Sequence, residues 1–189
     1  MKRTSGTLDA GLAAHRAGRA AEARRLYQLH LGERPDDGEA LHLLGALEAQ
    51  EGRLDLAREH LERAVALEPE FARAHYNLGN VQREQGDPES AAGSYRSAVA
   101  LAAGYTVAHV ALGRTLFELG RTDAAVLTLG QLLQREPRCA AAFAVLGEIL
   151  AAVGDLEQAG SALRRALELS PGDDGLRRRL SELGRPPVP

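Results

Sequence analysis

Hydrophobic residues recur at helical spacing along almost the whole chain, in short stretches that end at glycine or proline. Leu41, Leu44 and Leu47 form one such stretch, and Gly52 follows it. A second stretch runs from Leu54 to Leu67 before Pro69. Spacings of three and four residues indicate helices with one apolar face. Glycine ends a helix readily and proline cannot continue one, so the pattern predicts pairs of short helices joined by tight turns.

The helix pairs repeat with a period of 34 residues. Four positions keep this period across the chain without an insertion. They are Gly11, Gly45, Gly79, Gly113 and Gly147; Gly18, Gly52, Gly86, Gly120 and Gly154; Ala23, Ala57, Ala91, Ala125 and Ala159; and Pro35, Pro69, Pro137 and Pro171, with Ala103 in place of one proline. A fixed period of this length is typical of repeat architectures.

The two glycine series predict different roles. Gly52 and its equivalents stand before arginine or aspartate, where a left-handed residue closes the last helical turn. Gly45 and its equivalents lie in mid-helix, where glycine costs about 1 kcal/mol relative to alanine. We expect close approach of the second helix at its Ala57-type residue, with Leu61-type residues supplying bulk one turn further on.

The pattern Leu44-Gly45, Gly52, Ala57, Leu61, Ala64 and Pro69 with this period resembles the tetratricopeptide repeat. The resemblance implies an all-α fold, an α-solenoid in which antiparallel helix pairs form a right-handed superhelix. The period divides the chain into five repeats, 4–37, 38–71, 72–105, 106–139 and 140–173. The first repeat departs from the pattern, with Thr7 and Ala10 where larger apolar residues are usual.

The segment after the last repeat is predicted to be a capping helix over 174–184. Leu176, Leu180 and Leu183 share one helical face, and Asp173 or Asp174 can cap its start. A terminal repeat needs such a cover over its apolar side. Residues 185–189 form a proline-rich tail that is expected to be extended or disordered.

The resemblance also implies that the first helix of each repeat lines a concave groove, which suits an extended peptide or a helix of a partner protein. Asn77 and Asn80 can each bond a peptide backbone, and Arg73, Arg83 and Arg114 can hold an acidic group. Toward the fifth repeat the predicted groove becomes apolar. The ten predicted partner-binding residues are His42, Arg73, Tyr76, Asn77, Asn80, Arg83, Val110, Arg114, Phe117 and Glu148. Leu8 and Leu12 replace the lysine and asparagine of repeats that bind chaperone carboxyl termini, so such binding is not predicted.

Charge and composition narrow the class of partner. The net charge is −3, whereas a nucleic-acid-binding chain is usually clearly basic. The one basic cluster, Arg177 to Arg179, is interpreted as the solvated face of the terminal helix.

No apolar run is long enough to span a bilayer, and no apolar core follows Lys2 and Arg3, so no secretory signal is predicted. Cys139 is the single cysteine and cannot form an internal disulfide. We predict a cytoplasmic protein that binds no nucleic acid and does not insert into a membrane.

No pattern of catalytic or cofactor-binding residues emerges. The six histidines are scattered, and His75 and His109 share a phase without a third ligand. The glycines follow helix geometry and match neither phosphate-loop nor dinucleotide motifs. We therefore predict no metal, no cofactor and no enzymatic activity.

Three functions stay open at this stage. The first is a bacterial interaction scaffold or adaptor that binds another protein. The second is a substrate-recognition segment of a larger enzyme, because the stretch from Ala14 to Ala66 resembles repeats that precede bacterial glycosyltransferase or sulfotransferase domains. The third is self-association of two arrays through an exposed end.

Overall fold

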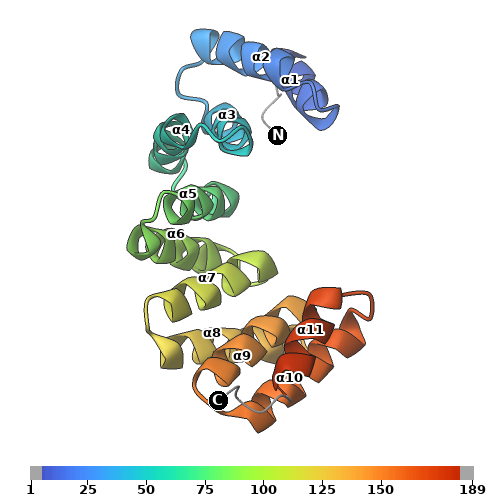
Figure 1. The fold of residues 1–189 in the computed structure, drawn as a ribbon. Coiled ribbons are helices and arrows are strands. Elements are labelled where there is room, and N and C mark those ends of the chain that lie inside the picture. Colours follow the sequence, from blue (N-terminus) through green and yellow to red (C-terminus); the bar gives the residue numbers. More distant parts are fainter. Residues whose placement is uncertain (1–5, 184–189) are drawn as a thin grey trace. The chain divides into compact units, whose positions relative to one another are not determined.

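The computed structural model describes residues 6–183, and this part of the chain forms eleven α-helices and no strand (Figure 1). The all-α prediction is confirmed. The chain divides into two units, residues 1–102 and residues 103–189. Within the described residues no helix is long and apolar enough to cross a membrane.

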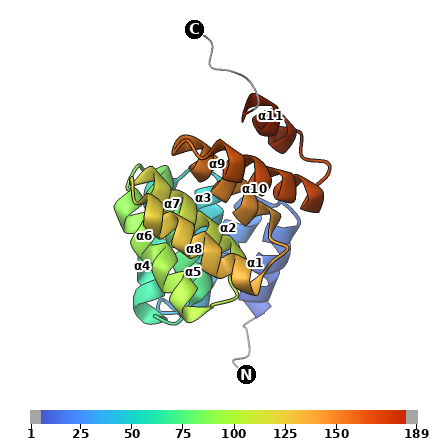
Figure 2. The ribbon, with the colours of Figure 1, turned by 90° about the horizontal axis from the view of Figure 1, so that it is seen from below.

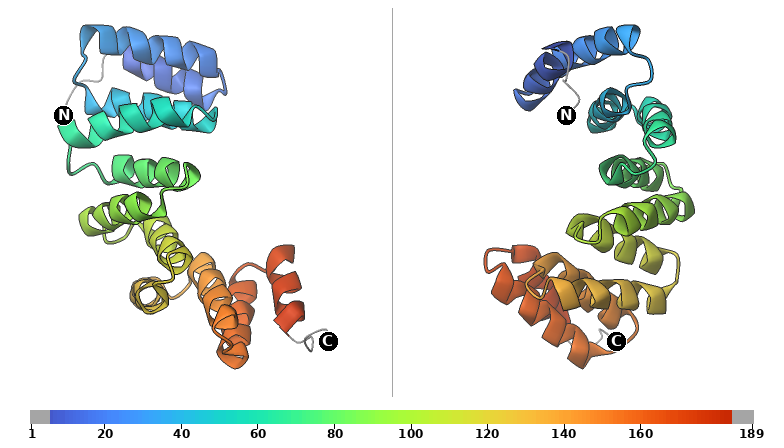
Figure 3. Two further views of the ribbon diagram at one scale, coloured as in Figure 1. Left: turned by 60° about the vertical axis from the view of Figure 1, so that its left-hand side comes forward. Right: turned by 180° about the vertical axis from the view of Figure 1, so that it is seen from behind.

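Unit 1 contains three antiparallel helix pairs that follow one another along the chain (Figure 3). Each pair packs on the next, because α2 contacts α3 and α4 contacts α5, and the first helices α1, α3 and α5 also touch in order. The six helices are α1 (Gly6–Arg16), α2 (Ala20–Glu33), α3 (Gly38–Gln50), α4 (Leu54–Leu67), α5 (Ala72–Glu84) and α6 (Pro88–Leu101).

Unit 2 contains two further helix pairs and a final single helix. The pairs are α7 with α8 and α9 with α10, and α11 lies beside α10 at the edge of the unit (Figure 2). The five helices are α7 (Thr106–Glu118), α8 (Thr122–Arg135), α9 (Ala140–Ala152), α10 (Leu156–Leu169) and α11 (Asp174–Leu183).

The turn inside each helix pair contains a left-handed glycine, as the sequence predicts. The five glycines of the Gly52 series have φ between +72° and +87°, and no other described residue has a positive φ. An aspartate then caps two of the five helices that follow these glycines, α6 and α10. The Asp87 carboxylate accepts a hydrogen bond of 3.1 Å from the Ser90 amide, and Pro88 opens α6 without needing a partner for a backbone N–H.

The mid-helix glycines permit close approach within each pair, and the bulky residue of the second helix lies even nearer to the glycine than the expected Ala57-type residue. A Cβ added to Gly45 would lie 2.8 Å from Leu61 Cγ and 3.1 Å from the Ala57 carbonyl oxygen. At Gly79 the Cβ would lie 2.7 Å from the ring of Tyr95. The bulky residue of the second helix therefore lies directly on the glycine, and the Ala57-type residue contributes its backbone.

One buried ionic cluster joins two helix pairs of unit 1. Glu48 of α3 is only 2 % exposed, and its carboxylate receives Arg24 of α2 at 3.1 Å and also Arg53, which precedes α4. Arg24 and Arg53 both pair with Glu51 as well. A buried carboxylate needs such partners because an unpaired charge is strongly unfavourable there. No pattern in the sequence indicates this cluster.

Helix α11 covers apolar residues at the end of unit 2. The Asp173 carboxylate accepts a hydrogen bond of 3.1 Å from the Leu176 amide, so Asp173 is the cap rather than Asp174. Leu176 is buried against Leu163 and Ala166, and Leu180 and Leu183 pack beside it. The predicted proline-rich tail, 185–189, lies outside the described residues.

Candidate functional site

The ten predicted partner-binding residues lie on four first helices of the pairs. Six of them belong to α3 and α5 of unit 1, and four belong to α7 and α9 of unit 2.

In unit 1 the structure brings His42 and Asn77 together. The Asn77 amide nitrogen lies 2.9 Å from His42 Nε2, which fixes the orientation of both side chains across α3 and α5. His42 is only 6 % exposed, its ring packs on Phe71 at 4.7 Å between centroids, and its Nδ1 has no hydrogen-bond partner. Burial, together with the nearby charge of Arg73, lowers the pKa of His42 to about 4. His42 is thus a neutral structural residue that supports Asn77.

Asn80 is fixed one turn further along α5. The Tyr95 hydroxyl of α6 donates a hydrogen bond of 2.7 Å to Asn80 Oδ1, and the ring of Tyr95 packs against Tyr76 at 5.8 Å between centroids. Asn77 and Asn80 are both half-buried and stand three residues apart, so they lie on the same face of α5. Two amide groups are thereby held in defined orientations on one surface.

Two arginines flank these amides. Arg73 is exposed near the start of α5, and its guanidinium carbon lies 5.6 Å from the centroid of the Phe71 ring. This cation–π contact keeps the charge near the surface without neutralising it. Arg83 is exposed near the end of the same helix.

In unit 2 the predicted residues Arg114 and Glu148 form an ion pair rather than presenting separate charges. Arg114 of α7 donates to the Glu148 carboxylate of α9 at 2.9 Å, and Arg179 of α11 pairs with the same carboxylate. Val110 and Phe117 are half-buried on α7. The expectation that Arg114 could hold a ligand's acidic group is therefore weakened, because Glu148 already occupies its guanidinium.

Two arginines of the basic cluster on α11 form ion pairs, whereas the sequence predicts only a solvated helix face. Arg177 pairs with Asp174, and Arg179 pairs with Glu148, while Arg178 is exposed. Only the tertiary arrangement brings Arg179 to α9, since the two partners are 31 residues apart in sequence.

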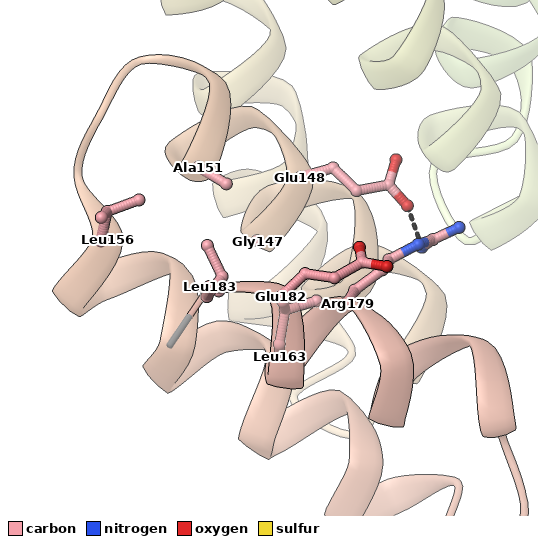
Figure 4. Close-up of a pocket in the computed structure, with 8 residues that line it drawn as sticks. All are labelled: Gly147, Glu148, Ala151, Leu156, Leu163, Arg179, Glu182 and Leu183. Atoms are coloured by element: carbon pink, nitrogen blue, oxygen red, sulfur yellow. Dashed lines mark hydrogen bonds and ion pairs between the residues drawn. The ribbon is translucent and has the colours of Figure 1, made fainter. Parts of the chain in front are cut away.

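A pocket of about 560 Å³ lies beside this ion pair, within unit 2 (Figure 4). Helices α9, α10 and α11 all contribute to it. The lining residues are Gly147, Glu148, Ala151, Leu156, Leu163, Arg179, Glu182 and Leu183. Of these, only Glu148 was among the predicted site residues. The sequence offered no sign of the pocket, because it depends on how α11 is placed against the last pair.

The histidines take structural positions among the described residues. His75 Nε2 lies 2.9 Å from the Pro69 carbonyl oxygen, and His109 Nδ1 lies 3.2 Å from that of Tyr105. His30 pairs with Asp37 at 2.9 Å. Across residues 6–183 no three histidine, cysteine, aspartate or glutamate side chains are grouped so as to hold a metal ion.

Comparison with known families and structures gives a consistent result. A family profile described as tetratricopeptide repeat matches residues 42–106 and again 110–174, and a second profile of the same description matches residues 5–33. No curated protein sequence matches the chain.

Solved structures of similar fold cover nearly the whole chain. MamA protein is 24 % identical with a TM-score of 0.78, over 97 % of this chain and 96 % of MamA. YrrB, described as a TPR protein with an unusual peptide-binding site, is 22 % identical with a TM-score of 0.79, over 93 % of this chain and 90 % of YrrB. TTC0263 of Thermus thermophilus, a thermophilic TPR protein, is 26 % identical with a TM-score of 0.69, over 94 % of this chain and 96 % of its own.

Proposed function

The chain belongs to the tetratricopeptide repeat family, and we propose that it is a scaffold that binds a peptide segment of another protein and performs no chemistry itself. The surface that we assign to this role in unit 1 is the α3–α5 face, defined here as Arg73, Tyr76, Asn77, Asn80 and Arg83, with the buried His42 supporting Asn77. The peptide-binding site of YrrB, a protein of the same fold, supports this proposal.

The observation that carries the proposal is the fixed orientation of Asn77 and Asn80. One bond to His42 leaves Asn77 with further donor and acceptor capacity, and the bond from Tyr95 leaves the Asn80 amide nitrogen for a ligand. A peptide in extended conformation presents one N–H and one C=O per residue that need partners. Side chains already held in place lose little conformational entropy when they bind.

Arg73 adds a preference for an acidic residue in the bound segment. Its guanidinium is exposed beside the two amides and, through Phe71, is held near the surface. Charge-assisted hydrogen bonds to a carboxylate are about twice as strong as neutral ones. The proposed ligand is therefore an extended peptide with an acidic side chain near its contact with Arg73.

The test uses peptides selected from a displayed random library against the immobilised full chain. We expect that Asn80→Asp, which keeps an acceptor for the Tyr95 hydroxyl but removes the amide N–H donors, weakens binding of the selected peptides. Arg73→Gln is expected to weaken the binding of peptides that contain an acidic residue. For each of the two variants we expect the affinity to fall by about five- to tenfold. Affinities are measured by fluorescence anisotropy.

Arg96→Ala serves as the matched control, because Arg96 is exposed on the second helix α6 and not on the α3–α5 face. Unchanged affinity in both Asn80→Asp and Arg73→Gln, with folding verified by circular dichroism, would contradict the assignment of this face. Failure of the library to yield any binder would count against the scaffold function as a whole.

A further inference from the structure

Helix α11 packs mainly against one helix of the last pair, α10. Its apolar face lies on α10, through Leu176, Leu163 and Ala166. First helices elsewhere in each unit also pack on the preceding first helix, as α3 does on α1 and α9 does on α7, whereas α11 has no comparable packing on α9. The pocket described above occupies the space where that packing is missing.

The interior of the pocket is mainly apolar. Gly147 contributes no side chain, so Leu163 forms the wall behind it, and Ala151 adds only a methyl group. Leu156, which is 53 % exposed, and Leu183 stand at the same end of the pocket (Figure 4). Its volume of about 560 Å³ is in the range of ligand-binding cavities, and it can receive one large apolar side chain together with part of a backbone.

The charged end of the pocket has an excess carboxylate. The negative charge of Glu148 is compensated by two ion pairs, one with Arg114 and one with Arg179. Glu182 is exposed at the pocket and makes no ion pair with any residue in the described range 6–183. A ligand that carries a cation next to its apolar group would therefore pair with Glu182 without displacing an existing ion pair.

We propose that this α9–α11 pocket is a second binding site, which takes a leucine- or phenylalanine-sized side chain of a partner peptide followed closely by a lysine or arginine. The inference rests on the proposed scaffold function, but it concerns a different surface and a ligand of opposite charge from the α3–α5 face. The apolar side chain enters between Ala151, Leu163 and Leu183, and the cation lies at Glu182.

The test uses a substitution that fills the pocket with a larger side chain. The full chain is panned against the same displayed peptide library, and the selected peptides are measured on Ala151→Leu and Ala152→Leu. Ala151 lines the pocket, whereas its neighbour Ala152 is exposed outside it, so the two variants add the same group in different places. We expect a class of peptides with an apolar residue next to a basic one, whose affinity falls at least about tenfold in Ala151→Leu and stays within about twofold in Ala152→Leu.

A charge reversal tests the second part of the proposal. Glu182→Lys is expected to lower the affinity for these peptides. It is expected to raise the affinity for analogues that have glutamate in place of the basic residue. Glu157→Lys is the control, because Glu157 is exposed on α10 and does not line the pocket.

Three results would overturn the proposal. Peptides of the basic class that bind Ala151→Leu as well as the wild type would show that the pocket is not used. Selected peptides that respond only to Asn80→Asp or Arg73→Gln would leave the scaffold function standing and remove this site. Dimers in light scattering that dissociate in Ala151→Leu would identify the occupant as a second copy of the chain instead of a partner peptide.

Discussion

At the scale of single residues, glycines inside helices fall into two classes that the structure separates. Gly79 lies in α5 against the ring of Tyr95, which is fully buried and bonded to Asn80. Gly93 lies in α6 with no atom within 4 Å of the position of an added Cβ. The same substitution should therefore have opposite effects at the two sites.

We predict that Gly79→Ala lowers the free energy of unfolding by about 1 to 2 kcal/mol, because displacement of the Tyr95 ring outweighs the better helix propensity of alanine. Gly93→Ala should raise the stability by up to about 1 kcal/mol, since only the propensity changes. Urea denaturation followed by circular dichroism measures both. Equal shifts in the two variants would refute the close-approach role of Gly79.

His42 provides a prediction for pH dependence. Its pKa is about 4 in the folded chain and 6.5 when unfolded, so between these values the unfolded chain binds more protons. This contribution to stability is complete above pH 6.5 and is lost as the pH falls toward 4, with a maximum of about 3 kcal/mol. We expect the urea midpoint to fall on acidification below pH 6.5, and to fall less in His42→Gln.

The His42 prediction would be wrong if His42→Gln showed the same pH dependence as the wild type. His75→Gln is a suitable control, because His75 is half-buried and bonds to a backbone carbonyl instead of packing in the interior.

The sequence indicates which residue types lie on the α3–α5 face but not which side chains they contact. Asn77 and Asn80 stand out in the sequence as hydrogen-bonding residues on a first helix. Their orientations depend on His42 and Tyr95, which lie 35 and 15 residues away in sequence. Periodicity locates a residue on a helix face, but it does not identify the side chain that meets it from another helix.

At the scale of helices, the sequence predicts most of the ends well. The left-handed glycines and the capping aspartates act through neighbouring residues only, so the local sequence contains the information needed. The position of α11 is different. Its apolar face was predictable from Leu176, Leu180 and Leu183, but the use of α10 as its main support is a tertiary property.

Helix α11 should depend on Leu176 for its attachment. Leu176 is 4 % exposed and is the only residue of α11 that is buried. We predict that Leu176→Ala removes the hydrogen-exchange protection of α11 amides while the amides of α9 and α10 keep most of theirs, because truncation of a buried leucine costs about 2 to 5 kcal/mol. Arg178→Ala, at an exposed position of the same helix, is the control. Uniform loss of protection across all three helices would contradict independent attachment.

At the scale of the whole molecule, each helix pair packs mainly on the pairs that neighbour it in sequence within its own unit. Unit 1 shows this clearly, because α1 and α2 contact α3 but none of the later helices of the unit in any substantial way. Stability in such an arrangement is close to a sum of terms for each pair and each interface between adjacent pairs.

We predict a graded response to damage at the start of unit 1. Leu8 is buried in a cluster with Tyr27 and Leu44, and Leu8→Ala should lower the hydrogen-exchange protection of α1 and α2 most, that of α3 and α4 less, and that of α5 and α6 least. Ala10→Gly, at an exposed position of α1, serves as a comparison in which the helix is weakened without removal of a core contact. Equal loss of protection in all six helices would indicate a single cooperative unit.

The contact between a mid-helix glycine and a bulky residue has a consequence for how this chain can change over generations. Gly45 meets Leu61 and Gly79 meets Tyr95, so both members of each contact belong to the same hairpin. Duplication or deletion of one whole hairpin therefore adds or removes the glycine and its bulky partner together, so neither residue is left without the other. Growth or shortening in complete hairpins demands fewer compensating substitutions than any insertion within one, and it alters the length of surface available to a partner without rebuilding the interior.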